Sequence, residues 1–219
     1  MRFVPREVEP YLEVVPGLDR RRAARTLLHA YTAGRRLLAG VGLWLAAAAA
    51  VVAVAIGALV ITSTVADGEP VRLALLGGLV VLLGLAAGWW AVRRGVELLR
   101  AGALLSRSAN SWMTPVPRPE PTVGHRVHEL LSVLRPEIYP RVVLCSLAGL
   151  GAVVAASVVG YSVAGVGVVD DVTAALSVLT GFVAAAFTVL CAVPAVALWR
   201  GARRVQRCLA KDAAVLAPR

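Results

Sequence analysis

The sequence predicts an all-α integral membrane protein. Its four transmembrane helices are expected to form two parallel helical hairpins, with an amphipathic cytoplasmic helix before each hairpin. Long apolar runs, a low charge content and a one-sided distribution of basic residues predict this fold class. Of the 219 residues, 58% are hydrophobic and 16% are charged. A soluble globule carries more charge and does not collect its apolar residues into long blocks.

Four apolar runs are each long enough to cross a bilayer, which takes about 18 to 20 residues. None of the runs contains Asp, Glu, Lys or Arg. They cover residues 37–66, 73–92, 142–169 and 172–199. A surface helix of a soluble protein keeps a polar face, so runs of this length predict four membrane-spanning helices.

Basic residues flank these runs on one predicted side of the membrane. Of the 23 Lys and Arg residues, Arg72 alone falls on the other side. Positively charged loops stay cytoplasmic, so we expect a multi-pass plasma-membrane protein with both termini in the cytoplasm. The net charge of +10 then marks orientation and contact with lipid headgroups, and we expect no nucleic-acid partner. Lys211 is the single lysine, and this preference for arginine indicates a prokaryotic source.

The N-terminal segment, residues 1–36, contains a predicted basic amphipathic helix. Asp19 is suited to cap its N-terminus. Ala24, Leu27 and Tyr31 recur at helical spacing, while arginines occupy another face. A helix of this kind suits the headgroup layer of the membrane. Docking on a partner protein would need the same pattern; the sequence favours the membrane surface, but no motif separates the two.

The rest of the chain divides into four further segments. Residues 37–100 form the first predicted hairpin and residues 142–200 the second. Residues 101–141 combine an extended, Pro-rich linker with a second amphipathic helix, and residues 201–219 form a basic cytoplasmic tail. Each half repeats the order of amphipathic helix, arginine, two apolar runs, tryptophan and arginine. Tandem duplication and shared topological rules explain this repeat equally well.

Small residues recur four apart in the apolar runs. Gly84 and Gly88 form a GxxxG pattern in the second run. The other pairs are Ala53/Gly57, Gly151/Ala155, Ala156/Gly160 and Gly181/Ala185. Small residues at this spacing let helix backbones approach closely, either within one chain or between chains.

Two groups of residues are candidate sites. The first group consists of membrane-interface anchors, since indole rings and arginines favour the headgroup layer: Trp89, Trp90, Arg93, Arg94, Trp199 and Arg200. The second is a candidate outer mouth that would attract cations: Asp67, Glu69, Asp170 and Asp171. Acidic outer turns also follow from topology alone, which is the preferred interpretation.

Catalytic chemistry is not predicted, because the runs lack the ionisable groups that intramembrane enzymes and coupled transporters need. We expect no metal and no cofactor; His125 and His128 lie three apart without further ligands. The predicted function is that of a non-enzymatic accessory, assembly or scaffolding subunit of a membrane complex. Its partners would be the lipid bilayer and either other membrane subunits or further copies of itself. The alternative is a component of a small-solute or ion transporter or channel.

Overall fold

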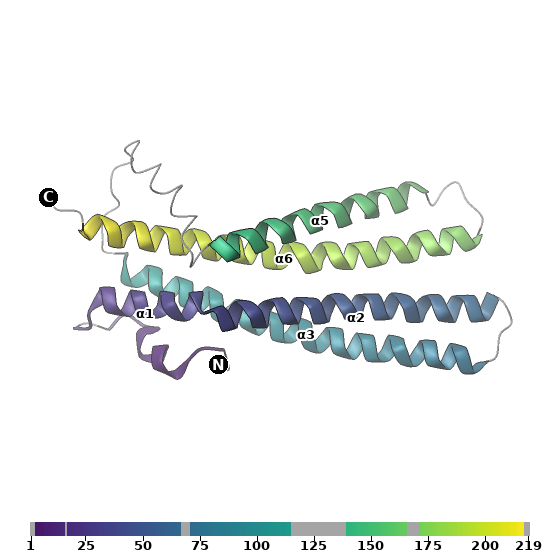
Figure 1. Cartoon of the computed structure of the whole chain (residues 1–219), viewed down its shortest axis with the longest axis horizontal. Coiled ribbons are helices and arrows are strands. Elements are labelled where there is room, and N and C mark those ends of the chain that lie inside the picture. Colours follow the sequence, from purple (N-terminus) through teal and green to yellow (C-terminus); the bar gives the residue numbers. More distant parts are fainter. Residues whose placement is uncertain (1–2, 16, 67–70, 115–138, 166–170, 217–219) are drawn as a thin grey trace. The chain divides into compact units, whose positions relative to one another are not determined.

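A computed structural model of the chain describes residues 3–15, 17–66, 71–114, 139–165 and 171–216 (Figure 1). These residues form helices and no strand, so the predicted all-α class is confirmed. The elements are the 3-10 helix η1 (Arg6–Tyr11) and the α-helices α1 (Arg20–Thr32), α2 (Gly34–Ala66), α3 (Val71–Trp112), α5 (Tyr139–Gly165) and α6 (Asp171–Leu216). The second predicted amphipathic helix, at residues 123–134, lies outside the described residues.

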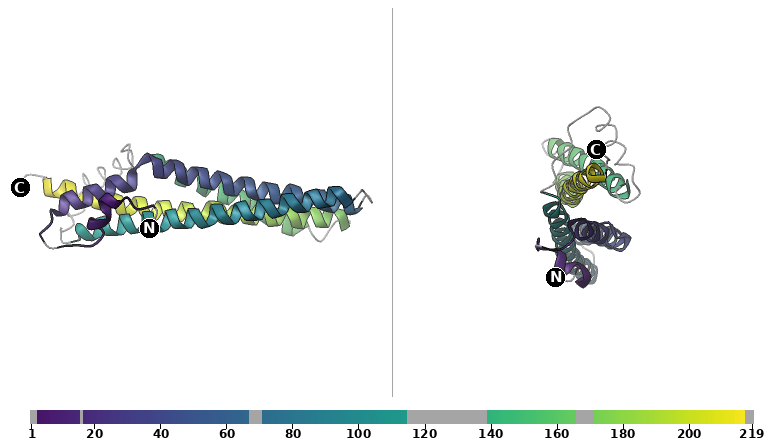
Figure 2. Two further views of the ribbon diagram at one scale, coloured as in Figure 1. Left: turned by 90° about the horizontal axis from the view of Figure 1, so that it is seen from below. Right: turned by 90° about the vertical axis from the view of Figure 1, so that its left-hand side faces the viewer.

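Helices α2, α3, α5 and α6 are long and apolar enough to cross a membrane, as the sequence predicts. Helix α3 has 42 residues and α6 has 46. At 1.5 Å per residue, helices of this length reach about 60–70 Å, whereas the hydrocarbon core of a bilayer is ~30 Å thick. Both helices therefore continue well past their apolar runs, and Figures 1 and 2 show their unbroken course.

The chain divides into two compact units. Unit 1 comprises Met1–Ala39, Val96–Ser146 and Pro194–Arg219. Unit 2 comprises Gly40–Gly95 and Leu147–Val193. Unit 2 thus contains most of the apolar runs, whereas unit 1 carries most of the arginines.

Within unit 2, glycines bring the backbones of α2 and α3 into direct contact. A Cβ atom added to Gly57 would lie 2.7 Å from the carbonyl oxygen of Gly77. One added to Gly84 would lie 2.9 Å from Val54 Cγ2, and one added to Gly88 would lie 3.3 Å from Ala50 Cβ. The two helices are antiparallel: along these contacts the residue numbers increase on α3 while they decrease on α2. The predicted small residues therefore serve packing within the chain at this place.

Unit 1 has a hydrophobic core that joins η1, α1 and the far ends of α3 and α6. Its fully buried members include Leu27, Leu105, Trp112 and Cys208. The indole Nε1 of Trp112 donates a hydrogen bond to the carbonyl oxygen of Tyr11 at 2.8 Å. Because the indole nitrogen is satisfied, the large Trp112 ring is buried without leaving a polar group unpaired.

The apolar face of α1 contributes directly to this core. Asp19 caps the helix as predicted, accepting hydrogen bonds from the backbone N–H groups of Arg21 and Arg22. The buried residues of α1 are Ala23, Ala24, Leu27 and Tyr31. They pack with α3 and α6 of the same chain, whereas contact of the arginine-rich face with the membrane surface or with a partner protein stays a prediction. The physical reason is that α3 and α6 continue past their apolar runs with apolar residues at the same helical spacing.

The Gly57–Gly77 contact predicts that a glycine-to-alanine substitution lowers stability at Gly57 but not at an open position of the same helix pair. Gly57→Ala should lower the free energy of unfolding by about 1–3 kcal/mol, because the new Cβ meets backbone that cannot move aside. The control is Gly78→Ala on α3, where nothing lies within 4 Å of the added atom. Thermal unfolding of the purified protein in detergent, followed by circular dichroism, measures both. Equal melting temperatures for the two variants would contradict the α2–α3 contact.

Candidate functional site

The candidate site of unit 1 is built around Tyr31, in the last turn of α1. Its side chain is 7% exposed. The ring lies against Gly102 of α3, where an added Cβ would be 3.6 Å from Tyr31 Cε2. On α6, a Cβ on Gly201 would overlap the Tyr31 hydroxyl and lie 3.1 Å from Cζ. Glycine at position 201 therefore makes room for the phenol.

Arg141, at the start of α5, covers the other side of this ring. Its guanidinium carbon lies 4.0 Å from the Tyr31 ring centroid, a cation–π contact. Its Nη2 donates a hydrogen bond to the carbonyl oxygen of Tyr31. Arg141 is 5% exposed, so a charged side chain is almost fully buried here. Burial lowers the pKa of Arg141 from its usual value, since desolvation disfavours the charged form.

Arg36, in the first turn of α2, is the second arginine of the site. Its Nη2 donates to the carbonyl oxygen of Leu98 on α3 at 3.4 Å. Its Nη1 is buried and has no hydrogen-bond partner in the part of the chain that the structure describes. The pKa of Arg36 is lowered by burial and, to a smaller extent, by the positive charge of Arg141. The two guanidinium groups thus repel each other across a partly desolvated space.

Arg204 of α6 lies close enough to Tyr31 for the two groups to interact electrostatically, and we call Arg36, Arg141 and Arg204 the arginine cluster. The Nη1 of Arg204 donates to the hydroxyl of Ser106 on α3 at 3.4 Å. Burial, and then the charges of Arg107 and Arg200, lower the pKa of Arg204. Tyr31 is the one described group that favours the charged forms of Arg36 and Arg141. The cluster therefore concentrates positive charge in unit 1.

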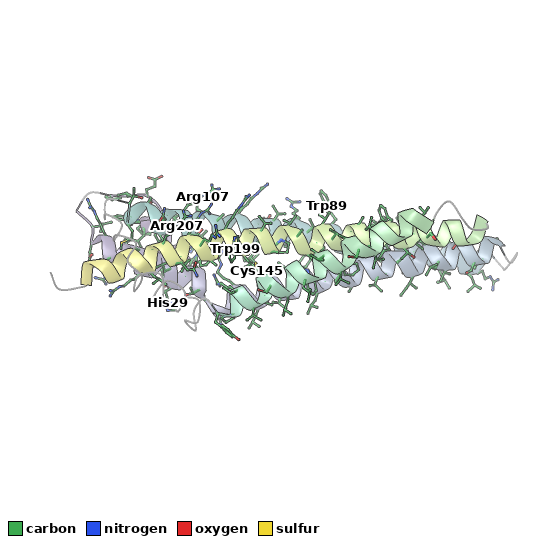
Figure 3. The ribbon with its side chains drawn as sticks, turned by 90° about the horizontal axis from the view of Figure 1, so that it is seen from above. His29, Trp89, Arg107, Cys145, Trp199 and Arg207 are labelled. Atoms are coloured by element: carbon green, nitrogen blue, oxygen red, sulfur yellow. The ribbon has the colours of Figure 1, made fainter. Side chains whose placement is uncertain are left out.

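The predicted anchor residues are mostly exposed on α3 and α6. Trp89 is 72% exposed, Trp90 56% and Trp199 46%. Arg93 and Arg200 are exposed as well, and Arg94 is half-buried. The guanidinium of Arg203, one turn beyond Trp199, lies 4.6 Å from the centroid of the Trp199 ring. Figure 3 labels Trp89 and Trp199, and their role as anchors stays a prediction.

The candidate outer mouth falls largely outside the described part of the chain. Asp67, Glu69 and Asp170 lie outside the described residues, and Asp171 is described only as the first residue of α6. In the described ranges, no group of three or more His, Cys, Asp or Glu side chains is placed to hold a metal ion. Cys145, Cys191 and Cys208 are free thiols; Cys145 Sγ donates to the carbonyl oxygen of Ala195 at 3.2 Å.

Comparison of the chain with models of protein families, with curated proteins and with solved structures finds no match. Geometry alone therefore identifies the arginine cluster, which sequence reasoning did not select. A signal was present: Arg36 and Arg141 each stand immediately before an apolar run, at equivalent points of the two halves. Arginines at these positions are also expected from the positive-inside rule, and nothing in the sequence pattern indicates that Arg36 and Arg141 are close in space.

The packing of Tyr31 predicts that alanine substitutions at Gly201 and Gly102 change the stability of the protein by different amounts. Gly201→Ala should lower the free energy of unfolding by about 1–3 kcal/mol, because its Cβ would displace the buried phenol. Gly102→Ala, with 3.6 Å to the same ring, should leave stability unchanged or slightly higher, since Ala favours helix. Thermal unfolding in detergent measures the difference. A Gly201→Ala variant as stable as the Gly102→Ala variant would refute this placement of Tyr31.

Proposed function

We propose that this protein is a non-enzymatic accessory, assembly or scaffolding subunit of a complex in the plasma membrane. The proposal rests on one observation: most of the apolar surface of the chain is not covered by the chain itself. In the four apolar stretches, only 6% to 17% of the residues are buried within the chain. Lipid tails cover such a surface without specificity, whereas partner helices cover it and gain close van der Waals contact where residues are small.

Helix α5 offers the best surface for such a partner, since its stretch has the lowest buried share, 6%. Gly149, Ala156 and Gly160 share one face of this helix by its 3.6-residue period. A Cβ added to Gly149 or Gly160 would meet nothing within 4 Å. Gly151 points elsewhere, because its added Cβ would lie 3.4 Å from Cys191 Sγ of α6. We assign the Gly149–Ala156–Gly160 face to contact with another subunit or a second copy.

Orientation follows from the distribution of charge. The chain crosses the membrane four times as two parallel hairpins and keeps both termini and the Arg-rich unit 1 in the cytoplasm. Every Lys and Arg except Arg72 then lies on the cytoplasmic side, as the positive-inside rule requires. Exposed arginines of α1, such as Arg20 and Arg22, would present a basic surface to an acidic cytoplasmic partner.

Two cysteine variants at opposite ends of α3 test this topology. Val71 is 73% exposed at the first residue of α3, and Ser111 is exposed in its last turn. In a background without the three native cysteines, Val71→Cys should react with a membrane-impermeant maleimide on intact cells. Ser111→Cys should react only after permeabilisation. The reverse pattern would invert the proposed orientation.

Association is tested by co-purification in mild detergent from cells that carry two differently tagged copies of the chain. The wild type should recover other membrane proteins or the second copy, because its α5 face is uncovered. Gly160→Leu should reduce this recovery at least about tenfold, whereas Gly78→Leu, at an open position on α3, should not. Recovery of this polypeptide alone, as a monomer, would rule out the subunit function.

A further inference from the structure

The arginine cluster contains one buried donor, Nη1 of Arg36, that has no partner among the described residues. A guanidinium group carries five N–H donors in one plane. Arg36 uses Nη2 for the Leu98 carbonyl, while its Nη1 is buried and unpartnered. Arg141 is 5% exposed and donates to the Tyr31 carbonyl. Unpaired buried donors are costly, and like charges held together are costly too, so the cluster is suited to receive an anion.

The type of donor and its location restrict the chemistry of that anion. A planar guanidinium group can donate two parallel hydrogen bonds to two oxygens of one phosphate group. A single carbonyl or hydroxyl oxygen cannot accept such a pair. Arg36 and Arg141 each directly precede an apolar run, at 37–66 and 142–169, so both belong to the headgroup level of a bilayer. Basic pockets at this level between membrane helices accept the phosphates of anionic lipids.

We propose that Arg36, Arg141 and Arg204 form a binding site for a phosphate group, carried by an anionic phospholipid headgroup or present as free phosphate. Arg36 and Arg141 supply the inner donors and hold the phosphate beside Tyr31. Arg204, which is half-buried and bonded to Ser106, closes the site from α6. The arginines come from the first turns of α2 and α5 and from the C-terminal half of α6, so the bound phosphate would connect three helix segments that belong to unit 1.

Further arginines increase the attraction of this site for anions. Arg107 of α3 and Arg200 and Arg207 of α6 lie close enough to Arg204 for their charges to lower its pKa. Figure 3 labels Arg107 and Arg207, on α3 and α6. These exposed side chains draw anions toward unit 1, and their contribution should weaken as salt is added.

The site goes beyond the proposed subunit function and does not depend on it, since it lies within one chain.

The test is thermal unfolding of the purified full-length protein in detergent, titrated with three probes. A short-chain phosphatidylglycerol presents an anionic phosphodiester, and a phosphatidylcholine of the same chain length is the zwitterionic control. Inorganic phosphate is the third probe. We expect phosphatidylglycerol to raise the melting temperature saturably, and phosphatidylcholine to have no such effect. A rise with inorganic phosphate as well shows that the phosphate group suffices; a rise with phosphatidylglycerol alone assigns the site to lipid.

Arg36→Gln and its control Arg22→Gln give the decisive comparison, because each removes one positive charge from unit 1 and Arg22 is exposed on α1. Arg36→Gln should weaken the apparent affinity for phosphatidylglycerol about 10-fold to 100-fold, through loss of charge-assisted hydrogen bonds. Without probe it should not lower the melting temperature, since it removes an unpaired donor and a like-charge repulsion. Arg22→Gln should bind as the wild type does.

Three outcomes would overturn the proposal. The first is a wild type that neither phosphatidylglycerol nor inorganic phosphate stabilises more than phosphatidylcholine does. The second is an Arg36→Gln variant with wild-type affinity. The third is an equal loss in Arg36→Gln and Arg22→Gln, which would show a nonspecific effect of net charge. Arg204→Gln, at a half-buried position, serves as a second variant: it should also weaken binding, and wild-type affinity there would exclude Arg204 from the site. Failure of co-purification would leave all of these results unaffected.

Discussion

Hydrocarbon offers no hydrogen-bond partner to a peptide group, and much of this architecture follows from that constraint. Over the residues that the structure describes, each apolar run satisfies its own N–H and C=O groups by forming one long helix. Hydroxyl groups in the runs obey the same rule. Those of Thr62, Ser63, Thr64 and Ser157 donate to carbonyl oxygens one turn earlier in their own helix. These four hydroxyl groups therefore need no partner helix for their hydrogen bonds.

Side-chain volume determines how closely α2 and α3 approach each other in unit 2. Between α2 and α3, glycines such as Gly57 and Gly77 let the backbones meet directly. On α5, by contrast, Gly149 and Gly160 face open space. The same residue type thus serves internal packing at one place and leaves surface for association at another. The open positions of Gly149 and Gly160 are the observation on which the proposed association with other subunits or further copies rests.

Unit 1 concentrates the charged chemistry that unit 2 largely lacks. Its core of Leu27, Leu105 and Trp112 brings the end of α1 beside α3 and α6. Tyr31 then reaches Gly102 and Gly201, and Arg141 covers its ring. Because this packing is tight, Arg36 and Arg141 are held partly desolvated near each other, with their pKa values lowered and one guanidinium nitrogen unpaired. The proposed binding site for a phosphate group rests on that arrangement.

The sequence by itself determined the all-α class, the four helices able to span a membrane and the Asp19 cap, because hydrophobic period, run length and capping are local properties. Local pattern could not show that α1 packs against its own chain, or that Arg36 and Arg141 meet around Tyr31, with 110 positions between Tyr31 and Arg141. It also could not separate the buried Gly57 from the open Gly160. Only the tertiary structure decided these points, since each depends on which helices become neighbours.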